Sequence, residues 1–341
     1  MKISWEPFEV QSAFPFKISR AIEDVVTRVW VRIEADGLEG WGEADPSPYY
    51  AEDQNTVVAA LERMKPVIEG ARDPFDLETL EGGLRAAIAP NPSAHAAVNS
   101  ALYDLVGKAL GQPLWKLWGL DPAAAPLSSY TIGMDTPDVV REKVRLASEY
   151  RILKIKVGTE NDEETLQAVR AESPDCTIRV DANAAWTAKE ALAAMPMLVH
   201  YGVEFVEQPL PPTDREGLRH LYEHSPLPII LDESCLVSTD IPGLVGMADG
   251  INIKFAKCGG PREALRMIHT ARACDLEVMM GCMLESTLGI APAAHLAPLL
   301  DYADLDGAAL LKEDPFEGPH IGPAGRIVLG DKPGLGVIRP D

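Results

Sequence analysis

The sequence predicts an α/β protein in which an α+β domain precedes a barrel of eight parallel strands. The first part of the chain reads as antiparallel strands followed by helices. From Leu127 onward, short apolar runs alternate with helical stretches, which is the pattern of repeated βα units. The apolar runs end 22 to 27 residues apart, so the structure repeats although the sequence does not. This spacing is typical of a (β/α)8 barrel.

Length, composition and charge limit the classes of protein to which the chain can belong. A chain of 341 residues with 46% hydrophobic content is long enough for about two domains. The net charge of -21 argues against a nucleic-acid surface and against an anionic membrane face. The five cysteines form no CxxC pair, which fits reduced thiols. With no signal segment and no run long enough to span a bilayer, we expect a cytoplasmic protein. Homo-oligomer formation stays open.

Strands open the first domain and helices follow them. The strand segments are rich in Val, Ile and Trp and are joined by a glycine-containing turn at residues 36–40. The helical segments place apolar side chains on one face. The predicted strands are residues 25–34 and 41–43, and the predicted helices are residues 56–68 and 92–110.

Two segments of this domain read as irregular loops that can reach a ligand. Residues 14–20 and 47–53 combine proline, aromatic side chains and charge. Arg20 is a candidate for carboxylate recognition, and a solvated loop charge is the alternative. We expect Tyr49 and Tyr50 to pack against their own domain.

Each apolar run of the predicted barrel ends at a residue of chemical interest. In a barrel the carboxyl ends of all eight strands meet around one point, which a doubly wound open sheet does not achieve. The predicted strand ends are Thr131, Lys156, Asp181, Glu207, Asp232, Lys254, Gly281 and Asp304.

Three successive strand ends carry carboxylates, at Asp181, Glu207 and Asp232. Like charges on neighbouring strands repel unless a cation lies between them. A set of oxygen ligands without His or Cys favours magnesium or manganese over zinc. Any one of these residues alone would be interpreted as an acidic helix cap.

Two lysines on one strand face the same side, because Lys154 and Lys156 are two residues apart. An exposed edge strand is the alternative explanation for this segment. Lys254 ends the sixth strand and should face Lys156 across the barrel mouth. Lysines on opposite sides of one carbon suit removal of a proton from one face and its return to the other. We expect Lys257, in the following turn, to be solvated.

These residues together resemble the enolase superfamily, in its muconate lactonizing enzyme subgroup. The resemblance extends over essentially the whole chain, including residues 101–105 and 111–114. It implies a capping domain (1–124), a modified (β/α)7β barrel (125–312) and a C-terminal segment that returns to the cap (313–341). It further implies Mg²⁺ binding by Asp181, Glu207 and Asp232, acid/base roles for Lys156 and Lys254 in forming an enediolate, and neutralisation of the substrate carboxylate by Lys154.

The end of the eighth predicted strand indicates which members of this subgroup the chain resembles. Asp304 and Asp306 are two residues apart, so both can face the mouth. This pair resembles that of the dipeptide epimerases, where it holds the free α-ammonium group of the substrate. Thr131 and the segment 281–287, which includes Met283, also resemble binding segments of that group. An acidic loop start is the alternative for the two aspartates.

The resulting hypothesis is a Mg²⁺-dependent dipeptide epimerase that inverts the α-carbon of the second residue. If the loop of Arg20 closes over the site, Arg20 would pair with an acidic side chain, which makes L-Ala-D/L-Glu the leading guess. A cycloisomerase or o-succinylbenzoate synthase of the same subgroup is the first alternative, but its substrate has no ammonium for Asp304 and Asp306 to hold. The second alternative is a non-catalytic metal-binding barrel. In such a protein we expect at least one metal ligand or lysine to be missing.

Overall fold

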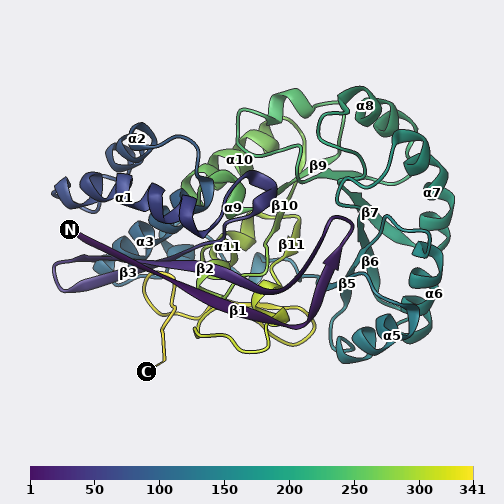
Figure 1. Cartoon of the computed structure of the whole chain (residues 1–341), viewed down its shortest axis with the longest axis horizontal. Coiled ribbons are helices and arrows are strands. Elements are labelled where there is room, and N and C mark those ends of the chain that lie inside the picture. Colours follow the sequence, from purple (N-terminus) through teal and green to yellow (C-terminus); the bar gives the residue numbers. More distant parts are fainter. Residues whose placement is uncertain (341) are drawn as a thin grey trace.

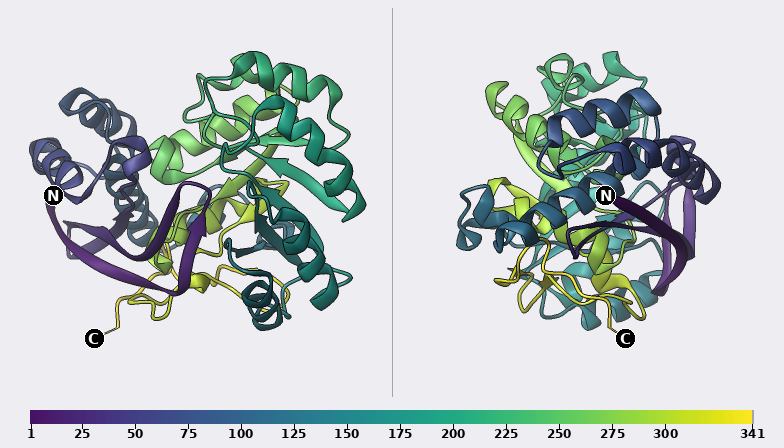
Figure 2. Two further views of the ribbon diagram at one scale, coloured as in Figure 1. Left: turned by 45° about the vertical axis from the view of Figure 1, so that its right-hand side comes forward. Right: turned by 90° about the vertical axis from the view of Figure 1, so that its left-hand side faces the viewer.

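An antiparallel sheet opens the chain in the computed structural model, which describes residues 1–340 (Figure 1). Its strands are ordered β1-β2-β3, and the predicted strands are confirmed as parts of the second and third. The bounds are β1 (Lys2–Ile18), β2 (Ala21–Ala35) and β3 (Leu38–Ala44). The hairpin of β1 and β2 extends from the cap to the barrel (Figures 1 and 2).

The prediction of an irregular loop at residues 14–20 is wrong. The segment continues β1 to Ile18, and Ser19 and Arg20 form the turn into β2. Phe16, Lys17 and Ile18 pair with residues of β2, which satisfies the backbone groups that a loop would leave open. Pro15 lies where the register shifts, so its missing N–H interrupts no ladder hydrogen bond.

Three helices complete the cap. They are α1 (Gln54–Gly70), α2 (Leu77–Ala87) and α3 (Pro92–Leu110), of which the second had no prediction. Helices α1 and α3 pack on the sheet, and α2 packs on these two helices. Residues 47–53 contain only the short 3-10 segment η1 (Pro48–Tyr50), as expected for a loop. Helix α3 lies directly on β3 because Gly40 and Gly42 have no side chain. A Cβ atom at either glycine would lie 2.0 Å from a carbonyl oxygen of α3.

Eight parallel strands form the predicted barrel, and every predicted strand end falls within one residue of the end observed. Ala303 in the last strand bridges Ser128 before the first, which closes the ring. The strands are β4 (Tyr130–Ile132), β5 (Ile152–Lys156), β6 (Thr177–Asp181), β7 (Val203–Glu207), β8 (Ile229–Leu231), β9 (Gly250–Ile253), β10 (Glu277–Gly281) and β11 (Tyr302–Asp304). Strand β5 lies between β4 and β6, so the edge-strand explanation of the lysines is wrong.

Helices surround the barrel and cover the apolar outer face of its strands. Short one-turn helices and 3-10 segments fill the remaining connections, and η5 (Gly307–Leu310) rather than a long helix follows β11. The helices are α5 (Pro137–Leu146), α6 (Asp162–Glu172), α7 (Ala188–His200), α8 (Arg215–His224), α9 (Phe255–Cys258), α10 (Pro261–Ala273) and α11 (Thr287–Leu296), with α4 (Leu114–Leu117) leading from the cap. None of the helices within residues 1–340 has the length and hydropathy needed to cross a bilayer.

The interior of the barrel is charged at the carboxyl end of its strands and largely apolar beneath, where the buried Arg179 lies over the Phe205 ring. Phe205, Ile230 and Met279 form a buried cluster inside the ring. Strand side chains alternate between the two faces, so Phe205 and Glu207 point to the same side. The apolar cluster closes the barrel beneath the charged residues at its carboxyl end.

The C-terminal segment returns to the cap (Figure 1). It contains the short strands β12 (His320–Ile321) and β13 (Ile327–Val328). Beyond them, the Leu335 N–H donates to Asp104 of α3 at 2.8 Å. We propose the predicted limits, 1–124, 125–312 and 313–341, as the division of the chain, with Asp341 outside the described residues.

Buried charges join the cap to the barrel beside the β10–α11 loop. Arg28 of β2 pairs with Asp45 at 2.7 Å and donates to the Leu284 carbonyl at 2.9 and 2.7 Å. Glu43 of β3 accepts hydrogen bonds from the N–H and hydroxyl of Ser286. Burial raises the pKa of Glu43 to about 8, and the neighbouring Glu285 adds to this.

Replacing Asp104 with Ala should lower the free energy of unfolding by about 3 kcal/mol or more. The Asp104 carboxylate is buried and accepts from the N–H groups of Trp41 and Leu335 and from Lys108. Its loss leaves the Trp41 and Leu335 N–H groups without this acceptor and removes the ion pair with Lys108. Urea unfolding measures the change, and the exposed Asp331→Ala serves as the control. Equal effects of the two substitutions would contradict this role.

Glu43 should make stability fall as pH rises. Its pKa in the folded chain, about 8, lies above its ordinary value of 4.5, so the folded state holds the proton more tightly. The stabilising contribution is therefore complete below pH 4.5 and is lost as pH approaches 8. Glu43→Gln cannot ionise, so the drop in unfolding free energy between pH 5 and 8 should shrink by about 3 kcal/mol. An unchanged drop in urea titrations would exclude Glu43 as its source.

Candidate active site

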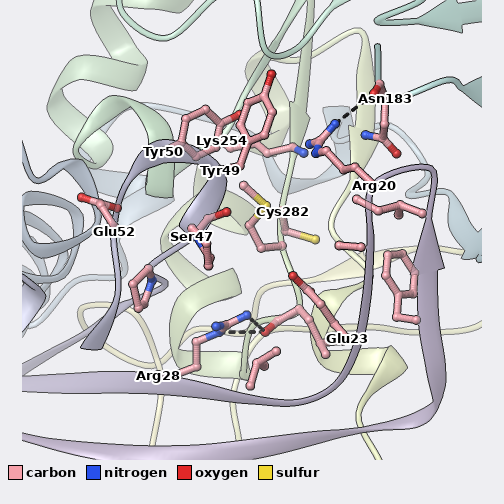
Figure 3. Close-up of a pocket in the computed structure, with 18 of the residues that line it drawn as sticks. Arg20, Glu23, Arg28, Ser47, Tyr49, Tyr50, Glu52, Asn183, Lys254 and Cys282 are labelled. Carbon is pink, nitrogen blue, oxygen red and sulfur yellow. Dashed lines mark hydrogen bonds between the residues drawn. The ribbon is translucent and has the colours of Figure 1, made fainter. Parts of the chain in front are cut away.

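A cavity of about 770 Å³ lies between the cap and the carboxyl ends of the barrel strands (Figure 3). Both parts of the chain line it, so the cap completes a site that the barrel begins. The predicted site residues in its wall are Arg20, Thr131, Lys154, Lys156, Lys254, Met283, Asp304 and Asp306. The other three, Asp181, Glu207 and Asp232, bond to these lysines.

Strand β5 brings Lys154 and Lys156 into the mouth, where carboxylates surround them. Lys154 Nζ lies 2.7 Å from both Glu207 Oε2 and Asp304 Oδ2 and 3.2 Å from Asp181 Oδ2. Lys156 Nζ lies 2.7 Å from Asp181 Oδ2. Burial opposes the charge on Lys154, but the three carboxylates outweigh it and raise its pKa well above the ordinary value. Lys154 is therefore a fixed positive charge.

Two lysines share Asp232, which directly follows β8. Lys254 Nζ lies 2.7 Å from Oδ2, and Lys257 Nζ lies 2.5 Å from Oδ1. The expectation that Lys257 is solvated is wrong. The one-turn helix α9 folds it back beneath the strand ends, where its side chain is fully buried.

The three predicted metal ligands lie side by side at the ends of β6, β7 and β8. Burial works against ionised Asp181, but Lys156 and Lys154 hold its pKa below the ordinary value. Lys254 and Lys257 do the same for Asp232. Burial raises the pKa of Glu207 to about 7, and the nearby Asp181 raises it further. Negative charge at Glu207 is therefore incompletely balanced by the lysines.

The chemistry of this group fits a hard divalent cation. Within residues 1–340, no three acidic, His or Cys side chains are spaced to hold a metal ion as they stand, and ammonium groups lie among the carboxylates. Two further oxygens nearby, Asn183 Oδ1 and Glu233 Oε2, are buried and accept no hydrogen bond from the described residues. Ionised carboxylates and unpartnered oxygens are the donors that Mg²⁺ prefers.

Asp304, which ends β11, and Asp306, two residues beyond it, both line the cavity. Asp304 Oδ1 accepts from the Ser129 hydroxyl at 2.6 Å, while Oδ2 contacts Lys154. Asp306 Oδ2 accepts from the Thr131 N–H at 2.5 Å. Burial raises the pKa of Asp306 to about 7, with a contribution from Asp304. A cation bound here would relieve this repulsion.

Met283 lies in the loop that follows β10, and a buried carboxylate holds its backbone. The Met283 N–H donates to Glu285 Oε1 at 2.8 Å. In the same loop, Cys282 Sγ accepts from the Gly307 N–H at 3.2 Å. The loop is thereby fixed to the segment that follows Asp306.

Arg20 lies at the tip of the β1–β2 hairpin and already has partners (Figure 3). Its guanidinium pairs with Glu233 at 2.6 Å and donates to the Asn183 carbonyl at 3.0 Å. It also lies over the Tyr49 ring, 4.2 Å from the centroid. The hairpin tip is thus attached to the barrel mouth by a charge pair.

Sequence analysis missed three functional candidates, Asn183, Glu233 and Lys257. The first two stand within two residues of predicted ligands, in Asp181-Ala182-Asn183 and Asp232-Glu233-Ser234. Their polar character next to a strand end is a usable signal. For Lys257 no comparable signal exists, because its burial depends on how a single helical turn folds back.

Comparisons with known proteins match the whole chain. A family model described as the mandelate racemase/muconate lactonizing enzyme N-terminal domain matches residues 3–119, and one described as enolase C-terminal domain-like matches residues 138–338. The L-Ala-D/L-Glu epimerase of Bacteroides thetaiotaomicron is 38% identical over 99% of this chain and 88% of its own. The L-Ala-D/L-amino acid epimerase of a Maribacter species is 39% identical over 99% of both chains.

A solved structure matches in three dimensions. The dipeptide epimerase from Enterococcus faecalis, in complex with Mg and the dipeptide L-Leu-L-Tyr, superposes with a TM-score of 0.91. The two sequences are 33% identical, and the match covers 98% of each chain.

Proposed function

The chain belongs to the mandelate racemase/muconate lactonizing enzyme family of the enolase superfamily, and we propose that it is a Mg²⁺-dependent dipeptide epimerase. One observation carries this proposal. Two lysines from opposite walls of the barrel and an aspartate pair line a single cavity, above three adjacent carboxylates. Such a site suits inversion of the α-carbon in the second residue of a dipeptide. That carbon carries a carboxylate, and the first residue carries a free amine.

Lys156 and Lys254 act as the two bases. They end β5 and directly follow β9, which are four strands apart in a ring of eight and therefore lie on opposite sides. One lysine takes the α-proton from one face of the substrate and the other returns a proton to the opposite face. In each direction the lysine that takes the proton is the neutral amine and the other is the ammonium. Asp181 contacts Lys156 and Asp232 contacts Lys254, which holds each side chain in place.

Asp181, Glu207 and Asp232 hold the metal ion in this proposal. When bound, Mg²⁺ supplies positive charge for the substrate carboxylate, on which negative charge builds up as the α-proton leaves. Lys154 adds a fixed charge from below. Lys154 contacts two of the proposed metal ligands, Asp181 and Glu207. It also contacts Asp304, which is proposed to bind the substrate ammonium group.

Asp304 and Asp306 bind the α-ammonium group of the first residue. Two buried carboxylates on one wall, one of them with a raised pKa, have negative charge to offer a cation. A cycloisomerase or o-succinylbenzoate synthase substrate has no such group, so this pair favours a dipeptide over those alternatives. All predicted ligands and lysines are present, which also disfavours a non-catalytic barrel.

The finer proposal for the substrate is L-Ala-D/L-Glu, with Arg20 facing the acidic side chain. An incoming carboxylate would have to share the guanidinium with Glu233, 2.6 Å away. A second candidate follows from that pairing, namely a dipeptide with an apolar second residue. The wall near the hairpin supplies apolar contacts for it, at Phe16, Ile18, Ile22, Val26 and Leu310.

A dipeptide library in deuterium oxide tests the activity and the substrate together. With Mg²⁺ present, we expect one deuterium at the α-carbon of the second residue, read by mass spectrometry. A glutamyl preference that Arg20→Met abolishes would support the first candidate. An apolar preference that Arg20→Met leaves within about threefold would support the second. Incorporation only into carboxylates without an amine would exclude a dipeptide epimerase.

Lys156→Ala and Lys254→Ala should each lower epimerisation by at least about a hundredfold, because each removes one of two bases. Each variant should still exchange the α-proton of one stereoisomer, the one that faces the remaining lysine, and the two variants should prefer opposite stereoisomers. Proton NMR in deuterium oxide follows this exchange. Lys143→Ala, at a lysine of α5 paired with Asp135, is the control. Exchange of the same stereoisomer by both variants would contradict the two-base assignment.

A further inference from the structure

Lys257 is a buried lysine for which the proposed reaction has no use. Its ammonium group donates to four oxygens: Asp232 Oδ1 at 2.5 Å and the carbonyls of Asp232, Asn252 and Cys235 at 2.7, 2.9 and 3.1 Å. Three N–H donors therefore serve four acceptors, none of which is solvent. Lys257 does not line the cavity, in contrast to Lys254.

The position of Lys257 results from one turn of helix. Lys254 has extended backbone angles, φ -133° and ψ 136°, and its side chain reaches the cavity. The chain then forms α9, in which the Lys257 N–H donates to the Lys254 carbonyl at 3.0 Å. Gly259, with φ 93°, ends the turn in a conformation that side chains rarely adopt. The turn thereby returns Lys257 to the strand ends beneath Lys254.

These contacts divide the two oxygens of Asp232 between two lysines. Oδ1 is bonded to Lys257 below the mouth, while Oδ2 is bonded to Lys254, which lines the cavity. A carboxylate held at one oxygen cannot rotate without breaking that bond and exposing a buried ammonium. Lys257 therefore fixes the orientation in which Asp232 meets Lys254. Lys257 also joins the loop after β8 to β9 through the Cys235 and Asn252 carbonyls.

We propose that Lys257 is a positioning residue that fixes the orientation of Asp232, one of the proposed metal ligands. The proposal rests on the proposed metal site. Partners that orient a ligand from behind commonly change metal affinity by 10- to 100-fold when removed. Lys257 has the burial, the charge and the contacts for such a role, and it touches no substrate.

The test is Mn²⁺ binding, measured by electron paramagnetic resonance on the full chain without substrate. Lys257→Met should weaken Mn²⁺ binding about tenfold or more. Lys257→Arg keeps the charge and the donors, but a planar guanidinium cannot reach all four oxygens from the same place, so we expect an intermediate loss of about threefold. Lys143→Met, at another buried lysine paired with an aspartate, should leave Mn²⁺ affinity unchanged.

The outcomes separate this inference from the function on which it rests. Failure of the unaltered protein to bind Mn²⁺ would overturn the metal site itself. Normal binding by the unaltered protein together with unchanged affinity in a folded Lys257→Met would overturn only the role of Lys257. If Lys257→Met does not fold, Lys257→Arg decides, since unaltered affinity in that folded variant contradicts positioning. A lower melting temperature without a change in Mn²⁺ affinity would show a purely structural role.

Discussion

Charge compensation among buried groups at the barrel mouth is the constraint on which the rest of the structure depends. Lys154 is only 2% exposed, and the carboxylates around it are equally inaccessible. Neither sign of charge would be tolerated there alone, because an unpaired ion in a protein interior costs several kcal/mol. The eight-stranded ring solves this by placing the three carboxylates of β6, β7 and β8 between lysines of β5 on one side and Lys254, after β9, on the other. The arrangement that stabilises the ions also sets out the parts of a reaction centre.

The sequence was sufficient to predict the barrel and most of the residues at its mouth. Regular spacing of apolar runs predicted the strand ends, and the two-residue period of a strand predicted that Lys154 and Lys156 share a side. Features that depend on a single turn were not predictable in this way. Lys257 looked like any exposed lysine of a glycine-rich turn, since nothing local reveals that α9 folds back. Residues 14–20 looked like a loop because pairing with β2 involves residues beyond the turn.

The cap and the barrel contribute different kinds of groups to the cavity. The barrel supplies lysines and carboxylates from strand ends, whose backbone is fixed by neighbours on both sides. The cap supplies Arg20 and apolar side chains from the end of a long hairpin. In the proposed function the barrel therefore supplies the acid/base and ammonium-binding groups, and the hairpin of the cap faces the side chain of the second residue.

The return of the C-terminal segment to α3 has a consequence for how the chain is made. The cap leaves the ribosome first, but Asp104 in α3 receives one of its hydrogen bonds from Leu335, near the other end of the sequence. A nascent chain stopped near residue 312 would already contain every proposed catalytic and metal-binding residue. It would still leave a buried carboxylate of α3 short of a donor. The cap therefore gains its last donor to Asp104 only after the segment around Leu335 has been made.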